Sequence, residues 1–464
     1  DGGNYAITGT KIFISGGEQD ITDNIIHTVL ARLEGAPEGT KGISLFVVPK
    51  FLVNEDGSLG ERNTVHCGSI EKKMGIKGSA TCVMNFDGAT GYLLGEENRG
   101  LEVMFKIMNA ARTGTALQGV SIGEASFQGA LAYARERLQM RALTGTANPD
   151  KPADPIIVQQ DVRRMLMTQK ALVEGSRAFV YWLARLNDLT QYGSEEDAAA
   201  AGDLMALLTP IAKAFCTETG QEVTSLGVQV LGGHGYISEH GMEQYIRDMR
   251  IAAIYEGTTG IQSLDLLGRK VMGSRGKLLR NFTKLIHKFC KANADNGELG
   301  ELLPPLVELN SQWGDITMKI GESAMEDANE IGAASVDYTM FSGYIVLAYM
   351  WAQMVQVAQE QLAADNAESA FYGAKLATAR FYFQRVLPRA RYHAEAAVAG
   401  AESVMNLDES ALHFWAAPAY DATVLSKNPW RTYCELLPRQ ENPGTKTTPG
   451  PYSRKPGTPD QHRP

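Results

Sequence analysis

One acidic residue, Glu256, stands where a short apolar run meets the start of a predicted helix. The run Ile251-Ala-Ala-Ile-Tyr precedes it, and Gly257-Thr-Thr-Gly follows it. A helix dipole favours a carboxylate at this position, and adjacent glycines let another molecule approach the backbone closely. Thr259 and Gln262 have the spacing of a capping box. The segment alone leaves two interpretations open: a general base beside a bound ligand, or an acid that only decorates a helix start.

Two further motifs suggest chemistry that their surroundings argue against. Gly119-Val-Ser-Ile-Gly123 matches the GxSxG pattern of serine hydrolases, which needs a strand and a sharp turn before a helix. Here the pattern lies inside a run of helical spacing, so Ser121 is predicted to be a helix residue and not a nucleophile. Gly232-Gly-His-Gly follows a helix, which argues against a dinucleotide-binding loop. No histidine stands at a metal-binding spacing, so no metal is predicted.

The composition predicts a globular protein of two or three domains. Its 464 residues exceed what one core usually serves, and 44% of them are hydrophobic. The net charge of −9 gives no general attraction to nucleic acid or to an anionic membrane. Five scattered cysteines without a CxxC pair predict neither a disulfide framework nor a zinc site, and they fit a reducing cytoplasm.

The periodicity of apolar residues divides the chain into four predicted parts. Residues 1–94 have short β-branched runs punctuated by Gly, Asn and Asp, which predicts a β domain. Helical spacing begins after Asn98, a candidate helix cap, and predicts one helical domain over 95–272 and an additional one over 273–430. The remaining 431–464 is rich in Pro, Gly and Thr and is predicted to be disordered. Because the chain opens in mid-pattern, we expect it to lack its natural N-terminus.

Three linked motifs resemble the C-terminal signature of the acyl-CoA dehydrogenases. They are Gln229-Val-Leu-Gly-Gly-His-Gly-Tyr236, Arg247-Asp248 and Tyr255-Glu-Gly-Thr-Thr, in the family's order and approximate spacing. Ile7-Thr-Gly-Thr-Lys-Ile-Phe-Ile-Ser-Gly-Gly resembles the flavin-facing strand of the family's β domain. The resemblance covers residues 1 to about 272. The added helical domain is similar to that of the longer subgroup, which includes 3-methylmercaptopropionyl-CoA dehydrogenases.

The resemblance implies a fold and a reaction. The fold is α+β and mostly α, with a β-barrel-like domain, a four-helix-bundle flavin domain and an added C-terminal helical domain. The reaction is FAD-dependent α,β-dehydrogenation of an acyl-CoA thioester to the 2-enoyl-CoA. Glu256 would remove the α proton while the β hydrogen leaves as hydride to the flavin. 3-Methylmercaptopropionyl-CoA is one candidate substrate, but subgroup membership does not fix the acyl group.

The family's binding residues carry over position by position. The implied flavin contacts are Phe13, Ser15, Arg137, Gln139, Gln159, Gln160, Gln229, Gly232, Gly233, Gly257 and Thr258. The substrate-side positions fall on Asn109 and Arg112, where an amide and a cation suit the polar arm of coenzyme A. An ion pair at the surface is the alternative for Arg112.

The resemblance also implies partners. Several flavin contacts would reach a neighbouring subunit, which predicts a homo-oligomer, a dimer or a tetramer. Electron-transfer flavoprotein is the implied electron acceptor, and an acyl-CoA oxidase that passes electrons to oxygen is a near alternative. A catalytically silent helical scaffold that retains the fold is the alternative from another class.

Overall fold

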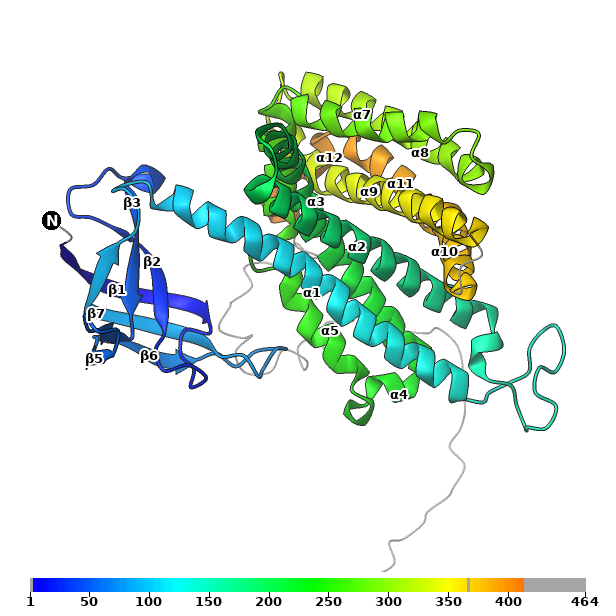
Figure 1. Cartoon of the computed structure of the whole chain (residues 1–464), viewed down its shortest axis with the longest axis horizontal. Helices are drawn as coiled ribbons and strands as arrows, with labels where there is room; N and C mark the ends of the chain where they lie inside the picture. Colours follow the sequence, from blue (N-terminus) through cyan, green and yellow to red (C-terminus); the bar gives the residue numbers. More distant parts are fainter. Residues whose placement is uncertain (1–2, 365–367, 413–464) are drawn as a thin grey trace, which may run out of the picture. The chain divides into compact units, whose positions relative to one another are not determined.

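The N-terminal part of the structure is a curled antiparallel sheet that forms half a barrel (Figure 1). Its strands are β1 (Asn4–Ser15), β2 (Ile26–Arg32), β3 (Ile43–Pro49), β6 (Val65–Ile70) and β7 (Thr81–Leu93), and a separate pair is formed by β4 (Phe51–Val53) and β5 (Leu59–Arg62). The strand order is β1-β7-β3-β2, and β6 also pairs with β7. Buried side chains such as Val29, Phe46 and Met84 fill the concave face.

Strand β1 carries two irregularities that change which way its side chains point. It pairs with β7 from Asn4 opposite Tyr92 to Ser15 opposite Thr81. The register shifts between Ile7 and Thr8 and again between Lys11 and Ile14. The second bulge leaves Phe13 outside the ladder, and bulges commonly re-aim a side chain near a functional site.

Helices make up the rest of the structure, which is a computed structural model describing residues 3–364 and 368–412. The first helices are α1 (Gly100–Glu136), α2 (Gln160–Tyr192), α3 (Glu195–Leu231), α4 (Gly233–Tyr236), α5 (Met242–Arg250) and α6 (Thr259–Leu264). The later helices are α7 (Lys277–Ala292), α8 (Gly297–Ser323), α9 (Asn329–Ala363), α10 (Ser369–Phe381), α11 (Arg389–Ala397) and α12 (Glu402–Met405). Short 3-10 helices lie at Gly39–Gly42, Ile156–Val158, Ser238–His240, Ile251–Ala253 and Glu409–Leu412. Two π-helical segments lie at Asp265–Met272 and Tyr382–Val386.

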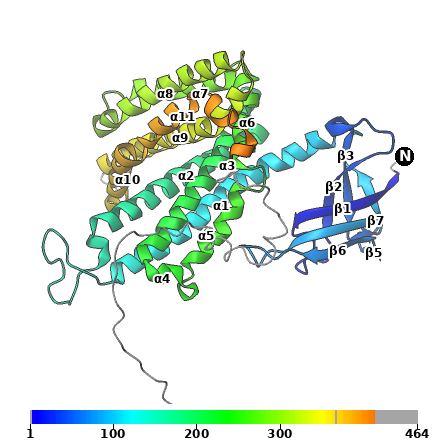
Figure 2. The same ribbon diagram turned by 180° about the vertical axis from the view of Figure 1, so that it is seen from behind.

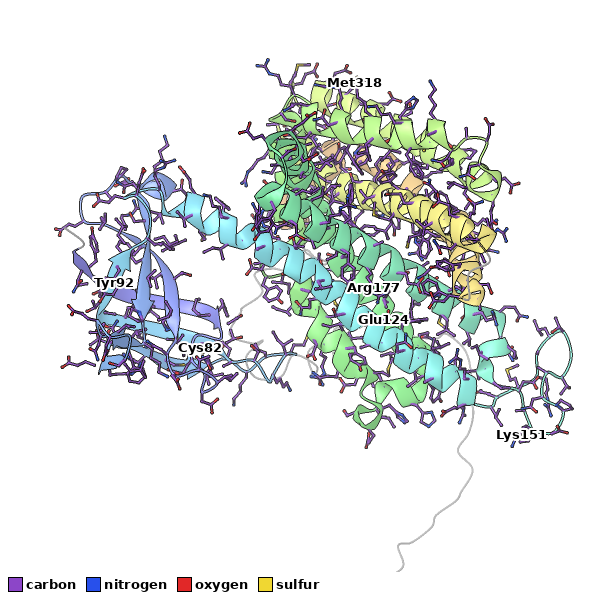
Figure 3. The ribbon with its side chains drawn as sticks, viewed as in Figure 1. Cys82, Tyr92, Glu124, Lys151, Arg177 and Met318 are labelled. Carbon is purple, nitrogen blue, oxygen red and sulfur yellow. The ribbon has the colours of Figure 1, made fainter. Side chains whose placement is uncertain are left out.

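Helices α1, α2, α3 and α5 form the predicted bundle, and both ribbon views show them side by side (Figure 2). Helix α1 approaches α3 so closely that a Cβ on Gly119 would lie 2.4 Å from the carbonyl oxygen of Cys216. Glu124 of α1 and Arg177 of α2 form an ion pair of 2.6 Å (Figure 3). Ser121 lies within α1, and its hydroxyl donates to the carbonyl of Leu117 at 2.9 Å. The helical interpretation of the GxSxG segment is therefore confirmed.

The later helices share one hydrophobic core with the bundle. The indole N–H of Trp351 on α9 donates to the carbonyl of Ala171 on α2 at 3.1 Å. The ring of Phe215 on α3 meets Tyr344 edge to face, with 4.9 Å between ring centroids. A continuous set of buried apolar side chains runs from α1 to α11. The domain border at residue 273 remains a prediction, because this core crosses it.

Residues up to Asn406 form one compact unit, and Leu407 begins a second. The predicted tail 431–464 and the end of the predicted domain 273–430 lie outside the described residues. Two described helices, α3 and α9, are long and apolar enough to pass for membrane spans. Within their most apolar windows, 61% and 67% of the residues are buried inside the fold, as in central helices of a packed bundle.

The predicted cap at Asn98 is wrong. The N-cap of α1 is Arg99, and no side chain caps that helix. Asn98 instead adopts a left-handed conformation with φ of +65°, and its N–H donates to the hydroxyl of Ser44 at 2.8 Å. Asparagine tolerates this conformation better than most residues, so here it serves the turn between sheet and helix.

Candidate active site

Glu256 lies in a strained turn between the 3-10 turn Ile251–Ala253 and α6. Glu256 has a φ of +55° and Gly257 a φ of +88°, so two consecutive residues are left-handed. This conformation costs an L-residue roughly 1–2 kcal/mol and persists only where surrounding contacts enforce it. Strain of this kind is concentrated at functional sites. The position of the predicted base is therefore unusual by its backbone alone.

Two side chains hold the carbonyl groups of this turn. The amide Nε2 of Gln262 donates to the carbonyl of Glu256 at 2.9 Å. The ammonium Nζ of Lys213, on α3, donates to the carbonyl of Gly257 at 2.6 Å. The φ of Gly257 favours glycine, and a Cβ there would lie 2.5 Å from Gln262 Nε2 and would displace the amide that bonds Glu256. In the described residues, no group accepts a hydrogen bond from the N–H of Glu256.

The ends of the turn are also fixed. The hydroxyl of Tyr255 donates to the side-chain oxygen of Gln118 on α1, and burial raises the pKa of Tyr255. Thr258 is the N-cap of α6, since its hydroxyl accepts from the N–H of Ile261 at 3.3 Å. The predicted capping box on Thr259 and Gln262 is wrong by one residue. Because the left-handed turn moves the helix start to Thr258, Gln262 bonds the backbone of Glu256 instead of a cap.

Lys213 is a member of the site that the sequence analysis missed. Its side chain is 0% exposed, and burial lowers its pKa from 10.5 to about 8. A signal was present: Lys213 is the only charge in the apolar run Leu204–Cys216, where an amphipathic helix would not place one. We refer to Glu256, Gly257, Lys213 and Gln262 as the glutamate turn.

The two substrate-side residues lie in different surroundings. Arg112 is 7% exposed and forms an ion pair with Asp265 at 3.5 Å, and Asp265 also lies 3.4 Å from Arg269. Asn109, three residues earlier on α1, is exposed. The ion pair of Arg112 is thus buried and not at the surface. A contact between Arg112 and coenzyme A remains a prediction.

Seven of the predicted flavin residues gather at the C-terminal end of α1, and we call them the distal cluster. They are Arg137, Gln139, Gln159, Gln160, Gln229, Gly232 and Gly233. An isolated bridge between Leu138 and Pro155 joins the end of α1 to the segment that leads into α2. Gly232 ends α3 with φ of +59°, and the next turn meets α1 where the hydroxyl of Tyr133 lies 3.0 Å from Nδ1 of His234.

A buried carboxylate, Asp154, organises the loop that carries part of this cluster. It accepts hydrogen bonds from the N–H groups of Ala142 (2.9 Å), Ala147 (3.1 Å) and Asn148 (2.7 Å). Arg141 pairs with it at 3.2 Å. The backbone bond from Ala142, followed by the other donors, lowers the pKa of Asp154 to about 2. The loop is therefore anchored at one point although its sequence is polar and rich in proline.

The glutamate turn and the distal cluster lie at different points along α1. Tyr255, which precedes the glutamate turn, bonds Gln118 of α1, and His234, which follows Gly233 of the distal cluster, lies against Tyr133 of α1. These residues are 15 positions apart, which corresponds to about 22 Å along a helix. The remaining predicted contacts, Phe13 and Ser15, lie on β1, where Phe13 is 69% exposed with φ of +59°. Gly257 belongs to the glutamate turn, and Thr258, the next residue, is the N-cap of α6.

The exposed groups have the chemistry that a flavin dinucleotide needs. The guanidinium of Arg137 makes no ion pair within the described part of the chain, and Gln139 beside it is exposed. A free guanidinium and amides suit the oxygens of a diphosphate. The exposed ring of Phe13 suits a planar ring system. In residues 3–364 and 368–412, no group of three His, Cys, Asp or Glu side chains could hold a metal ion.

Comparison with known proteins identifies the family. Residues 98–272 match the profile of the acyl-CoA dehydrogenase C-terminal domain, and residues 282–408 match that of the acetyl-CoA dehydrogenase C-terminal-like family. A broad-specificity linear acyl-CoA dehydrogenase of Mycobacterium tuberculosis is 34% identical over 88% of this chain and 70% of its own length. The chain belongs to the acyl-CoA dehydrogenase family. Members of this family use FAD.

Two further relatives place the chain within the family. A 3-methylmercaptopropionyl-CoA dehydrogenase of Ruegeria pomeroyi is 44% identical over 83% of this chain and 65% of its own length. A butyryl-CoA dehydrogenase of Syntrophomonas wolfei is 32% identical over 88% of the chain and 68% of its own length. The chain thus spans about two thirds of the length of these relatives.

Solved structures show the same fold. The Caenorhabditis elegans protein ACDH-11, in complex with C11-CoA, matches 85% of this chain and 63% of its own with a TM-score of 0.68 at 21% identity. An acyl-CoA dehydrogenase of Bacillus anthracis, complexed with FAD, matches the same shares with a TM-score of 0.65 at 20% identity. The predicted fold class, a barrel-like sheet followed by a mostly helical part, is confirmed.

Proposed function

We propose that the protein carrying this chain dehydrogenates an acyl-CoA thioester between its α and β carbons, with Glu256 as the base. The observation that carries the proposal is the glutamate turn. Glu256 has a left-handed backbone, and a buried amide and a buried ammonium hold the backbone carbonyls of Glu256 and Gly257. Within the described residues, no group accepts a hydrogen bond from the N–H of Glu256. A carboxylate that only decorated a helix start would not need this arrangement.

The role of Glu256 follows from the acidity of the substrate. The α proton of a thioester is too weakly acidic for a carboxylate in water, so negative charge must be stabilised on the thioester oxygen as the proton leaves. The N–H of Glu256, which bonds nothing within the described residues, is a donor of the required kind, and it belongs to the same residue as the carboxylate that takes the proton. A base of this type contributes on the order of 10²- to 10⁴-fold to the rate.

The cofactor of this reaction is FAD, which accepts the hydride from the β carbon when it is bound. The distal cluster, Phe13, Ser15, Gly257 and Thr258 would hold it. Their exposed guanidinium, amide, hydroxyl and aromatic groups fit its diphosphate and its ring system. The separation of about 22 Å between the two groups along α1 supports the further proposal that one flavin site is completed by two subunits of a homo-oligomer.

The substrate, the electron acceptor and the location belong to the same proposal. The relative from Ruegeria pomeroyi supports a short acyl-CoA such as 3-methylmercaptopropionyl-CoA, with Asn109 and Arg112 on the coenzyme side. Electron-transfer flavoprotein is the proposed acceptor, and oxygen is the alternative. The free thiols of Cys67, Cys82, Cys216 and Cys290 support a reducing, cytoplasmic location.

The test is anaerobic reduction of the bound flavin by a panel of thioesters. Butyryl-CoA, octanoyl-CoA and 3-methylmercaptopropionyl-CoA are each added to the full-length, FAD-saturated protein, and bleaching of the flavin absorbance is followed. Bleaching by at least one of them supports dehydrogenation, and the ranking of rates identifies the acyl group. A protein that binds FAD but is bleached by none would favour the silent scaffold.

A further inference from the structure

Lys213 is a buried cation whose ammonium bonds a backbone carbonyl and not a carboxylate. Its side chain is 0% exposed on α3, and within the described residues it makes no ion pair. Burying an ammonium costs free energy unless it is paired or hydrogen-bonded, and replacing such a group by an apolar residue is often neutral or stabilising. Stability alone therefore gives no reason for a lysine here. Its single observed bond, to the carbonyl of Gly257, indicates what it does.

The charged groups around Lys213 come from three elements. Glu218 lies one turn further along α3, Glu256 lies in the turn before α6, and Arg112 faces Lys213 from α1. The two carboxylates favour the protonated amine, whereas Arg112 and burial oppose it. Arg112 is itself paired with Asp265. Lys213 is thus the positive group that faces the proposed base from inside the fold.

The bond to Gly257 acts on the conformation of Glu256. Peptide groups are planar, so holding the carbonyls of Glu256 and Gly257 fixes the two peptide planes on either side of Gly257. Those planes set the φ and ψ angles of Gly257 and also the ψ angle of Glu256. They therefore restrict the freedom of Glu256 to leave its left-handed conformation and relieve its strain. Loss of one of the two bonds would let the carboxylate and the N–H of Glu256 lose their common orientation.

We infer that Lys213 is a positioning residue for the proposed base. Its ammonium holds the carbonyl of Gly257 and thereby keeps Glu256 in the conformation in which its carboxylate and its N–H can both reach the thioester. This inference rests on the proposed function. A structural role and a positioning role predict opposite results for Lys213→Met. If Lys213 only supported the fold, its removal would lower stability, whereas a positioning residue can be replaced at no cost to stability but at a cost to the rate.

The experiment compares Lys213→Met with Lys375→Met in the full-length, FAD-saturated protein. Lys375 on α10 is also largely buried, with its ammonium 2.9 Å from Glu174, and it lies outside the glutamate turn. Four quantities are measured. They are the Tm, the hydrogen–deuterium exchange of peptides spanning residues 251–262, and the rate constant and apparent Kd for flavin reduction by the best acyl-CoA of the panel.

For Lys213→Met we expect an unchanged or higher Tm and roughly 10-fold faster exchange over residues 251–262. We also expect a saturating reduction rate about 10- to 100-fold lower, the size of effect that a misplacement near 1 Å produces, with little change in apparent Kd. For Lys375→Met we expect a lower Tm with parental exchange over residues 251–262 and a parental rate. Burial holds the pKa of Lys213 near 8, so the Tm advantage of Lys213→Met should shrink between pH 8 and 10.5.

The inference would be overturned if Lys213→Met showed parental exchange and a parental rate. It would also be overturned if Lys375→Met showed the faster exchange and the lower rate that are expected for Lys213→Met. If Lys213→Met does not accumulate as folded protein, Lys213→Gln, which keeps a donor without a charge, is measured in the same way and judged by the same exchange criterion. A parent protein that no acyl-CoA reduces would refute the proposed function instead. In that case the exchange measurement still decides whether Lys213 holds the turn.

Discussion

The glutamate turn and the distal cluster use their polar groups in opposite ways. At the turn, buried side chains of the same chain hold the backbone carbonyls, so the geometry of Glu256 is fixed before any ligand arrives. At the far end of α1, Arg137, Gln139 and Gln229 are exposed. Preorganised, water-excluded groups suit bond breaking, and exposed donors suit binding. In the proposed function, the groups that break bonds therefore come from one subunit, and a neighbouring subunit completes the binding of the cofactor.

The largest effect is expected for Glu256→Gln. The amide keeps the shape of the side chain but cannot accept the α proton, so flavin reduction by acyl-CoA should fall on the order of 10²- to 10⁴-fold. FAD content should remain parental, because the distal cluster is untouched. Stopped-flow absorbance measures the first quantity and the flavin-to-protein ratio the second. Glu308→Gln on α8, an exposed ion-paired acid, serves as the control and should behave as the parent.

Arg137→Ala should have the reverse profile. Loss of a charge-assisted bond to a diphosphate should weaken FAD binding about 10-fold or more, while a flavin that is bound is still reduced at a near-parental rate. Titration of the apoprotein with FAD measures the affinity. Arg135→Ala, two residues earlier on the same exposed end of α1, is the matched control.

Mixing Glu256→Gln with Arg137→Ala tests whether the two residues serve the same flavin from different subunits. If Arg137 serves the flavin next to a neighbour's Glu256, hybrid oligomers of Glu256→Gln and Arg137→Ala contain one site with both changes and one with neither. Roughly a quarter of the sites in a dimer mixed at random would then be intact. The mixture is assayed at an FAD concentration at which most sites of Arg137→Ala alone hold no FAD. If mixing then recovers no activity, both residues lie around the same subunit's flavin.

A smaller effect on stability is expected for Asp154→Asn. Three backbone donors and Arg141 favour the ionised carboxylate, so its pKa is lowered to about 2 from an ordinary 3.8. A carboxyl group whose pKa is lowered by folding stabilises the fold at every pH above its ordinary pKa. This contribution is lost as the pH falls through 3.8 toward 2. The Tm deficit of Asp154→Asn should therefore be full at pH 7 and shrink in that interval. A constant deficit would show that the interaction is not charge-dependent.

No effect is expected for Ser121→Ala. The hydroxyl is exposed on α1 and bonds only the helix backbone, so the unfolding free energy should change by less than about 0.5 kcal/mol. Flavin reduction should be parental, and a fluorophosphonate probe should leave the protein unlabelled. Labelling at Ser121 would revive the hydrolase interpretation.

The local sequence pattern predicted the helices and strands of this molecule better than it predicted the geometry of the candidate active site. The helical spacing after residue 100 and the β-branched runs before it correctly separated sheet from helices, because each element buries one face along its own length. Glu256 was found from neighbours in the sequence. The left-handed conformation of Glu256 could not be predicted from those neighbours, because Lys213, which helps to hold it, lies 43 residues upstream. The partner of Arg112 is likewise 153 residues away.

The close packing of α9 against α2 and α3 has a consequence for biosynthesis. Trp351 and Tyr344 fill spaces beside residues made more than a hundred positions earlier, and a Cβ on Gly343 would lie 2.1 Å from the ring of Phe215. Until α9 leaves the ribosome, the apolar surfaces of α2 and α3 that pack against α9 have no cover. We therefore expect the nascent bundle to need shielding by a chaperone until α9 has emerged. In a variant whose other tryptophans are replaced, the indole of Trp351 offers a fluorescence signal for the moment at which the core closes.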